Sequence, residues 1–230
     1  KGLSPIQKTV FQIIVAIIVS FFVYYSPYVG DKLYIPFTMK EISLGIFAVP
    51  FYVFVFVAFT NAVNLTDGLD GLAGKTSVAY TVFFASVISV IIYRFGVAGE
   101  VREEYFNLLV FCMALIGALC GFLLFNSYPA AVFMGDTGAL ALGGALAGLA
   151  VMSKLSLIAP IIGIMYVVSC VSDIIQVLHF KRTRHRVFLM APFHHHLERK
   201  GMHENKIVSL YTLITFLVGA VTLVIILALN

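Results

Sequence analysis

Charge is scarce in this sequence. Asp, Glu, Lys and Arg together make up 11% of its 230 residues, whereas a soluble globular domain carries roughly a quarter. Hydrophobic residues make up 61%, and the mean hydropathy is +1.02. This shortage of charge excludes a soluble globular domain and indicates an integral membrane protein.

Cysteine is also rare, and its spacing excludes several kinds of site. Cys112, Cys120 and Cys170 lie in apolar runs without the spacing of a metal or redox motif, so we expect small core residues. The run 194–196 is three consecutive His without a Cys or a His-Glu-x-x-His pattern beside it. Consecutive side chains point in different directions on a regular element. The sequence therefore disfavours zinc there and favours phosphate or substrate binding.

Long apolar runs are abundant. A run of roughly 20 mainly apolar residues can cross a bilayer, and the chain has seven, at about 7–25, 43–63, 76–93, 105–125, 138–152, 155–178 and 207–229. We predict an all-α polytopic membrane protein with residues 1–230 in a single transmembrane domain. Alternation in 33–38 favours a short hairpin, and Pro50 should kink the second span.

The basic residues are unevenly divided between the two sides of the membrane. With a cytoplasmic start, ten Lys and Arg fall on the cytoplasmic side and five on the other. The positive-inside rule therefore predicts a cytoplasmic start and an external carboxyl end. The basic cluster 181–186 follows from this rule and would also attract anionic substrates or lipid headgroups.

Residues 61–74 form a polar stretch directly after an apolar run. Amide and carboxylate side chains recur there at a step of three, and glycines keep the same step: Asn61, Asn64, Asp67 and Asp70, then Gly68, Gly71 and Gly74. On a helix, this spacing predicts one polar stripe beside a strip of bare backbone. Such a stripe belongs where the span reaches water or a polar cavity.

Two further polar stretches lie on the same side, because an even number of predicted spans separates each from 61–74. One contains Asp136 at a predicted helix start, and the other contains the His run. A helix start offers N–H groups to an anion, and Mg²⁺ binds carboxylates together with phosphate oxygens and water. Two interpretations of these stretches remain open: they form a Mg²⁺–phosphate site, or they are ordinary turns and helix caps.

The sixth predicted span also contains polar side chains, namely Ser169, Ser172, Asp173 and Gln176. An acid at that depth indicates either a functional site or a residue satisfied by its polar neighbours. Two pairs of glycines at a spacing of four, Gly117 with Gly121 and Gly144 with Gly148, predict close helix contacts and permit a homodimer.

Three long motifs, at residues 61–73, 133–138 and 191–198, resemble those of the MraY family of phospho-N-acetylmuramoyl-pentapeptide transferases. This family belongs to the superfamily of polyprenyl-phosphate N-acetylhexosamine-1-phosphate transferases. The resemblance implies Mg²⁺-dependent transfer of phospho-MurNAc-pentapeptide from UDP-MurNAc-pentapeptide to undecaprenyl phosphate. The products would be lipid I, for peptidoglycan synthesis, and UMP.

The resemblance also implies where the protein works and with what. It implies a multi-pass protein of the bacterial inner (cytoplasmic) membrane, surrounded by the lipid bilayer, with its active site on the cytoplasmic face and no nucleic-acid partner. Members of the family have about ten membrane spans, each of roughly 20 residues. We therefore expect residues 1–230 to be a carboxy-terminal portion, with a missing amino-terminal segment that carries an Asp-Asp motif.

The resemblance also implies roles for single residues, according to their positions in the matching motifs. Asp136 matches the acid that holds Mg²⁺, Asn64 matches an amide that shares it, and Asp67 and His194 match catalytic positions. The matches to substrate-binding positions are Asn61, Gly68, Leu69, Asp70, Asn126, Phe133, His195 and His196, with Asp70 near the uracil and Phe133 stacked on it. Ser169 and Asp173 depart from the family pattern, so the resemblance supports no role for Asp173.

Three alternatives remain from the sequence. A related UDP-HexNAc:polyprenyl-phosphate transferase shares the Asn/Asp stretch, although the uninterrupted His run disfavours it. A transporter would explain the polar residues of the sixth span, and a fragment without catalytic activity would follow if the missing segment carries an essential base.

Overall fold

We describe the protein from a computed structural model that covers residues 4–38, 40–95 and 97–229. Its elements are α1 Pro5–Tyr24, β1 Lys32–Tyr34, β2 Glu41–Ser43, the 3-10 helix η1 Gly45–Phe47, α2 Ala48–Thr66, α3 Leu72–Arg94, α4 Gly99–Asn126, α5 Gly135–Met152, α6 Ala159–Ile162, α7 Ile164–Thr183, α8 Phe193–Arg199 and α9 Glu204–Ala228.

Seven of these helices are long and apolar enough to cross a membrane. Many of their large hydrophobic side chains are exposed, including Phe22 on α1 and Leu124 on α4. Exposed apolar surface of this extent is typical of helices that face lipid. The predicted all-α polytopic membrane fold is confirmed.

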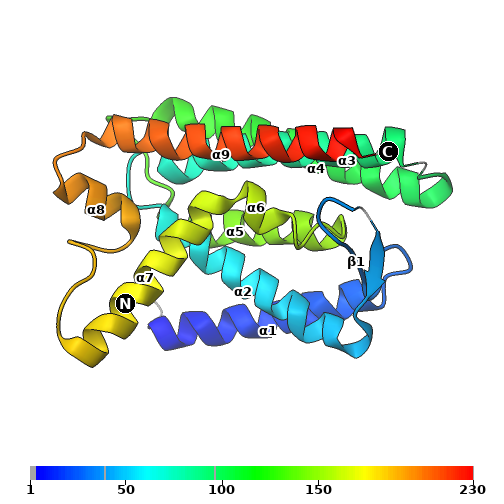
Figure 1. The fold of residues 1–230 in the computed structure, drawn as a ribbon, viewed down its shortest axis with the longest axis horizontal. Coiled ribbons are helices and arrows are strands. Elements are labelled where there is room, and N and C mark those ends of the chain that lie inside the picture. Colours follow the sequence, from blue (N-terminus) through cyan, green and yellow to red (C-terminus); the bar gives the residue numbers. More distant parts are fainter. Residues whose placement is uncertain (1–3, 39, 96, 230) are drawn as a thin grey trace.

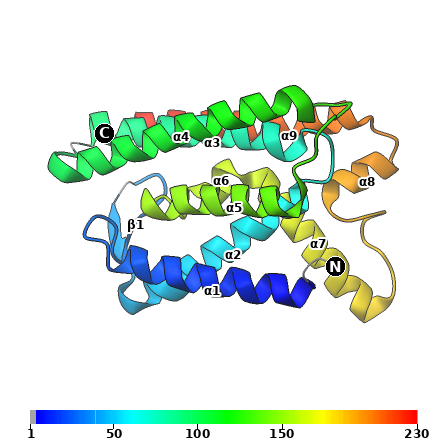
Figure 2. The same ribbon diagram turned by 180° about the vertical axis from the view of Figure 1, so that it is seen from behind.

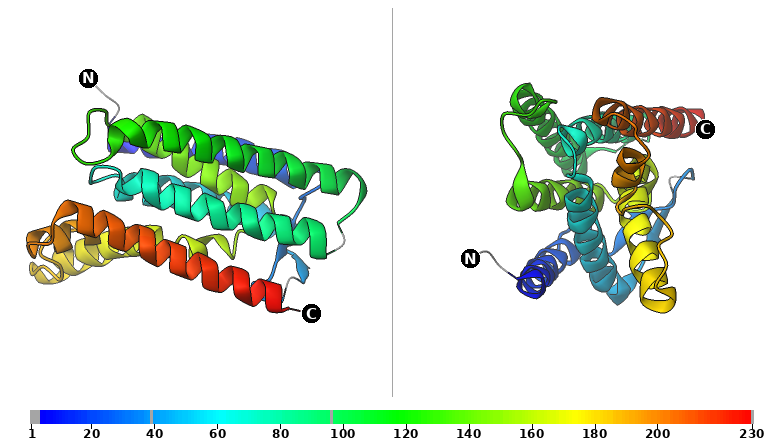
Figure 3. Two further views of the ribbon diagram at one scale, coloured as in Figure 1. Left: turned by 90° about the horizontal axis from the view of Figure 1, so that it is seen from above. Right: turned by 90° about the vertical axis from the view of Figure 1, so that its left-hand side faces the viewer.

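The helices are arranged around α2 and α3. Helix α2 packs against α1, α5 and α7, and α3 packs against α4 and α9. Figure 1 shows α3, α4 and α9 together along one side and α1 with α2 along the other, with α5 and α6 between them. The end-on view in Figure 3 shows the same grouping. Tyr52, Tyr80 and Phe84 are among the largest buried side chains of this core.

The sixth predicted span is interrupted. Helix α6 ends at Ile162 and α7 begins at Ile164, with Gly163 between them. A Cβ at Gly163 would lie 3.0 Å from the Ala159 carbonyl oxygen and 3.1 Å from the Tyr166 ring, so the chain passes close to its neighbours there. Beyond this break, α7 runs obliquely to the other helices (Figure 1).

A two-stranded antiparallel hairpin, β1 with β2, closes one end of the molecule, and we call this the hairpin end (Figure 2). Leu33 pairs with Ile42, so the predicted hairpin is confirmed, although its strands are shorter than expected and lie on either side of 35–38. Lys154 fixes this end, because its Nζ donates to Glu41 Oε1 at 2.8 Å and its carbonyl accepts from Tyr34 N at 2.9 Å.

Three local predictions are wrong. Pro50 lies in the first turn of α2, where no intrahelical N–H bond is needed, so it does not interrupt the helix. Cys120 is exposed, since it faces away from the helices that pack against α4. The glycine pairs also differ from expectation. A Cβ at Gly117, Gly121 or Gly148 would meet no described atom within 4 Å, and one at Gly144 would meet only Thr60 Cγ2 of α2, at 3.8 Å. The close contact with α2 is made by Gly143 instead.

Candidate functional site

The three polar stretches lie at one end of the bundle, opposite the hairpin, and we call this the site end. The carboxyl end of α2, the amino end of α5 and the short helix α8 all lie there (Figure 1). Counting crossings therefore placed these stretches correctly on one side of the bundle.

The predicted helical stripe over 61–74 ends halfway. Helix α2 stops at Thr66, and Asp67 leaves the helical conformation with φ −79° and ψ 53°. Gly71 has φ +74°, a left-handed conformation that favours glycine, and α3 starts at the next residue. Asn61 and Asn64 are thus on a helix, whereas the two Asp side chains are on a tight turn between two helices. The prediction of one continuous stripe is wrong beyond Thr66.

Asp136 lies in the first turn of α5, as predicted from its sequence context. One of its carboxylate oxygens accepts a hydrogen bond from Asn64 Nδ2 at 3.3 Å, and the other forms an ion pair with Lys8 of α1. The side chain remains 58% exposed. Helices α1 and α2 therefore bring polar groups to a carboxylate on α5 that a ligand can still reach. The sequence reasoning did not identify Lys8.

Asp67 lies close enough to Asp136 for the two charges to interact. Burial, together with the nearby charge of Asp136, raises the pKa of the Asp67 carboxyl from its ordinary value of 3.8 to about 6. The site thus contains two neighbouring carboxylates and one amide. A bound cation would relieve their repulsion.

These groups fit Mg²⁺. Carboxylate and amide oxygens are its usual protein ligands, and it keeps several waters or phosphate oxygens. Asn64 donates its amide N–H₂ to Asp136 in this arrangement, and turning the amide over would direct its oxygen to the same place. Within the described ranges, no group of three or more His, Cys, Asp or Glu has metal-binding geometry. A cation held here would need further ligands from outside this group of residues.

The His run forms the first turn of α8 and lies against the turn after α2. His194 has an exposed fraction of 0%, and neither ring nitrogen has a hydrogen-bond partner among the described residues. Burial lowers its pKa from 6.5 to about 3, so the ring is neutral at physiological pH. A Cβ at Gly68 would lie 2.2 Å from His194 Nε2 and 3.1 Å from His195 Nε2. Gly68 therefore allows the His run to touch the turn.

The three His rings have different contacts. His194 contacts the Tyr211 ring of α9, with centroids 6.2 Å apart. His195 Nδ1 lies 2.9 Å from Glu198 Oε2, and His196 Nδ1 accepts from the Leu189 amide at 3.1 Å. This divergence agrees with the argument against a three-His metal site.

Asp70 connects the turn to two other segments. Its carboxylate Oδ2 accepts from Ala130 N at 2.8 Å, and its own N–H donates to Glu204 Oε1 at 2.5 Å. Sequence reasoning did not identify Glu204 as part of the site. Asn126 is 3% exposed and donates to the Val132 carbonyl at 2.8 Å. Both side chains thus hold the loop 127–134 in place.

Phe133, on that loop, is 72% exposed and available for a ring to stack on it. Asn61 donates to Gln12 Oε1 at 3.0 Å and to the Val57 carbonyl at 2.7 Å, so it joins α2 to α1. Leu69 packs on a second apolar cluster that includes Leu72 and Tyr211. Asn61 and Leu69 therefore have structural contacts of their own, which their predicted role in substrate binding did not anticipate.

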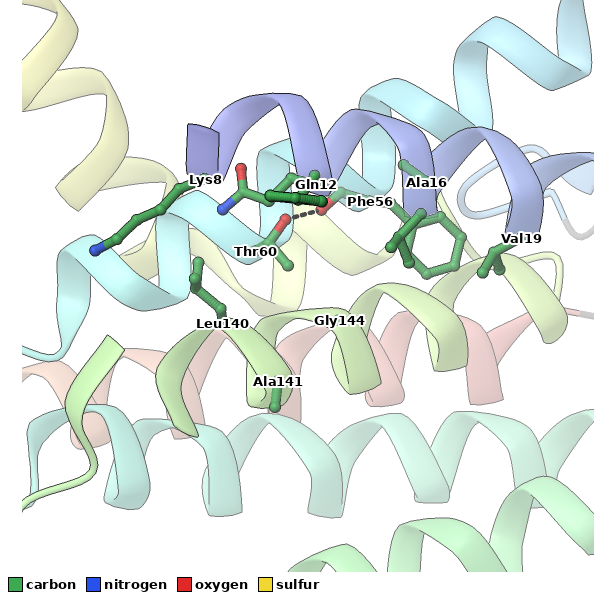
Figure 4. Close-up of a pocket in the computed structure, with 11 residues that line it drawn as sticks. Lys8, Gln12, Ala16, Val19, Phe56, Thr60, Leu140, Ala141 and Gly144 are labelled. Atoms are coloured by element: carbon green, nitrogen blue, oxygen red, sulfur yellow. Dashed lines mark hydrogen bonds between the residues drawn. The ribbon is translucent and has the colours of Figure 1, made fainter. Parts of the chain in front are cut away.

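An apolar groove of about 480 Å³ runs between α1, α2 and α5. Its walls include Val15, Phe56 and Leu140, and Lys8 lies at its site end (Figure 4). The same Lys8 contacts Asp136. The apolar groove therefore ends next to the polar site.

Comparison with known proteins gives consistent results. Residues 1–154 match the glycosyl transferase family 4 profile. The chain is 46% identical over 227 residues to a phospho-N-acetylmuramoyl-pentapeptide-transferase of Clostridium novyi (strain NT), which covers 97% of this chain and 66% of that protein. It is 46% identical over 215 residues to the protein of that name from Clostridium perfringens (strain 13 / Type A), covering 94% and 63%.

A third protein of this name, from Clostridioides difficile (strain 630), is 42% identical over 223 residues, covering 97% of this chain and 66% of that protein. The chain thus spans slightly less than two thirds of the length of these curated relatives. With its seven apolar helices, it is a multi-pass bacterial membrane protein. Because the family profile matches most of its length, the chain belongs to glycosyl transferase family 4.

Proposed function

We propose that this protein transfers phospho-MurNAc-pentapeptide from its UDP conjugate to undecaprenyl phosphate, forming lipid I and releasing UMP at the cytoplasmic face of the membrane. The observation that carries the proposal is the meeting of Asp136, Asn64 and Asp67 at one end of the bundle, next to a buried His run. The names of the relatives support the same reaction.

The reaction joins two anions, so it depends on neutralising charge and on positioning. Asp136 and Asn64 would hold Mg²⁺, with Asp67 beside them. When bound, the ion would neutralise charge on the pyrophosphate and polarise its oxygens. Lys8 supplies a further positive charge at the same place. His194 would act from its buried position against Gly68, where its neutral ring holds the turn that carries Asp67.

The donor nucleotide would lie over the loop 127–134. Phe133 presents an exposed ring on which the uracil would stack. In this proposal Asp70 and Asn126 act mainly through the loop, because their side chains already bind its backbone. Loss of either would displace Phe133 and weaken nucleotide binding.

The acceptor needs an apolar path for its isoprenoid chain and a cation for its phosphate. The groove between α1, α2 and α5 supplies both, with Lys8 at the end next to Asp136. Helix α1 begins at the site end, so a preceding segment with an Asp-Asp motif would enter beside this site (Figure 1). That segment would supply the base for the lipid phosphate.

Release of UMP tests the proposal. We expect the complete gene product, reconstituted with UDP-MurNAc-pentapeptide and undecaprenyl phosphate, to release UMP only with Mg²⁺ present. Asp136→Asn should lower kcat at least roughly 100-fold, the size of effect seen when one transition-state electrostatic contact is lost. Glu103→Gln, which removes an exposed carboxylate near the start of α4, is the control and should release UMP at the wild-type rate. Near-normal UMP release by Asp136→Asn at saturating Mg²⁺ would contradict the proposal, as would solute transport without UMP release.

A further inference from the structure

Helix α7 carries a line of polar side chains that the proposed chemistry does not use. Ser169, Ser172 and Gln176 are spaced by three and four residues, so they share one face of the helix. This face meets the segment 184–192 as the chain turns back from the end of α7 toward α8. The sequence indicated these residues as polar groups in a span without explaining them.

Gln176 holds the returning segment with three hydrogen bonds. Its Oε1 accepts from Val187 N at 3.1 Å and from Phe188 N at 3.0 Å, and its Nε2 donates to the Phe188 carbonyl at 3.1 Å. The carboxamide uses both its donor and its acceptor, as a backbone peptide does when it pairs with a strand. A single side chain thus fixes two consecutive residues.

Ser172 fixes the start of α8. The first N–H groups of a helix lack internal acceptors, and a cap side chain normally supplies one. Pro192, at the cap position of α8, has no side-chain oxygen. Ser172 Oγ accepts from Phe193 N at 2.9 Å instead, while donating to the Ser169 carbonyl at 2.8 Å. The cap of α8 therefore comes from a different helix.

Few other contacts hold this segment. Residues 181–187 are exposed, as are Leu189 and Met190. The apolar packing that remains is the Phe188 ring against Phe193 and His196, with centroids 6.1 Å and 5.6 Å apart. The Leu189 amide also donates to His196 Nδ1 of α8 at 3.1 Å. The hydrogen bonds from α7 therefore act together with this contact to hold the start of α8.

We infer that Ser172 and Gln176 are positioning residues that hold α8 so that His194 lies against Gly68. His194 directly follows Phe193, the residue bound by Ser172, so a shift of that peptide moves the imidazole. The catalytic consequence rests on the proposed function. The structural part does not, because it concerns the placement of α8 alone.

The test compares Gln176→Ala and Ser172→Ala with Ser172→Thr, which keeps the hydroxyl, and with Val177→Ala, a neighbour on the exposed face of α7. Amide hydrogen exchange is measured at 187–199, and kcat and KM are measured from UMP release by the complete gene product. We expect amide hydrogens to exchange at least 5-fold faster than in wild type at 187–188 in Gln176→Ala and at 193 in Ser172→Ala. The same increase should extend through α8 in both variants. We also expect kcat/KM to fall at least 10-fold, with Ser172→Thr and Val177→Ala within 2-fold of wild type.

Two outcomes would overturn the inference. One is α8 remaining as protected in Gln176→Ala and Ser172→Ala as in Val177→Ala. The other is faster exchange with kcat/KM unchanged in an active protein. If the wild type releases no UMP, the proposed function fails, but the exchange of α8 still decides whether α7 positions it.

Discussion

Gly68 is the residue on which the contact between the His run and the α2–α3 turn depends. Its missing side chain leaves room for His194 Nε2, which would lie 2.2 Å from an added Cβ. The neighbouring ring is fully buried and has little freedom to move away. Gly68 does not have a positive φ, so its backbone conformation does not require glycine. Glycine is needed here because the neighbouring His194 leaves no room for a side chain.

We predict that Gly68→Ala lowers kcat/KM for UMP release at least roughly 10-fold, because overpacking of about 1–3 kcal/mol must displace His194 or the turn. Steady-state kinetics of the complete protein measures this change. Gly117→Ala is the matched control, since a Cβ there meets no described atom within 4 Å. Equal kinetics for the two variants would contradict the close contact.

Asp67 makes stability depend on pH. Its pKa in the folded protein is about 6, above the ordinary 3.8, because burial disfavours the charged form. Ionising it therefore costs stability as pH rises from 3.8 through 6, and the cost is complete above 6. An uncharged side chain avoids that cost.

We predict that Asp67→Asn, in detergent with EDTA, has a higher melting temperature than wild type at pH 7.5, and that this difference shrinks at pH 4. The same variant should release UMP poorly, since a carboxylate next to Asp136 is lost. Calorimetric or fluorescence melting at both pH values measures the first effect. A difference that is the same at both pH values would show that Asp67 has an ordinary pKa.

For individual residues, the sequence predicted the place of a residue on its helix better than the partners of its side chain. Asp136 was expected at a helix start because Gly-Asp-Thr-Gly is typical of one, and it lies there. Lys8 and Glu204 were not identified, since each reaches its partner from a distant part of the chain. A three-residue step also cannot distinguish a helix from a helix that ends in a turn, which is why Asp67 and Asp70 were misplaced.

At the scale of the elements, α5 approaches the backbone of α2 very closely. A Cβ at Gly143 would lie 2.6 Å from Thr60 Cα and 2.8 Å from the Phe59 carbonyl oxygen, and backbone atoms cannot move aside as a flexible side chain does. Asn64 and Asp136 lie on these same two helices, and their hydrogen bond joins them at the site end. The spacing of α2 and α5 thus sets the distance between the two proposed metal ligands.

We predict that Gly143→Ala lowers the free energy of unfolding by roughly 1–3 kcal/mol and weakens Mg²⁺ binding, because α5 moves away from α2. Thermal melting and Mg²⁺ titration of UMP release measure the two effects. Gly148→Ala, on the same helix but with open space at its Cβ, should be close to wild type. Identical behaviour of the two variants would argue against the tight α2–α5 contact.

The seven apolar spans were predictable because crossing a bilayer demands length and hydrophobicity that the sequence displays directly. The glycine contacts were not predictable. Glycines spaced by four share one face of a helix, but only the packing of the folded protein determines whether that face contacts another helix. The break at Gly163 was not predicted either, because the close packing around this residue, including the Tyr80 ring 3.3 Å from an added Cβ, leaves no periodicity in the sequence.

Mg²⁺ binding at the site should stabilise the whole folded protein against unfolding. A ligand that binds only the folded state stabilises it by RT ln(1 + [L]/Kd), about 1.4 kcal/mol at ten times Kd. We predict that Mg²⁺ raises the melting temperature of the wild type and has little effect on Asp136→Asn. Melting curves with a Mg²⁺ series and a Na⁺ control at equal ionic strength measure this. An equal rise in both proteins would place the ion elsewhere.

The oblique course of α7 connects this protein to the mechanics of its membrane. Its exposed face carries Ile174, Ile175 and Leu178, so acyl chains surround it. A tilted helix accommodates a thicker or thinner hydrocarbon layer by changing its angle. Because Ser172 and Gln176 fasten α8 to α7, such a change of angle carries the His run with it. We therefore expect the acyl-chain length of the surrounding lipid to influence the position of the His run.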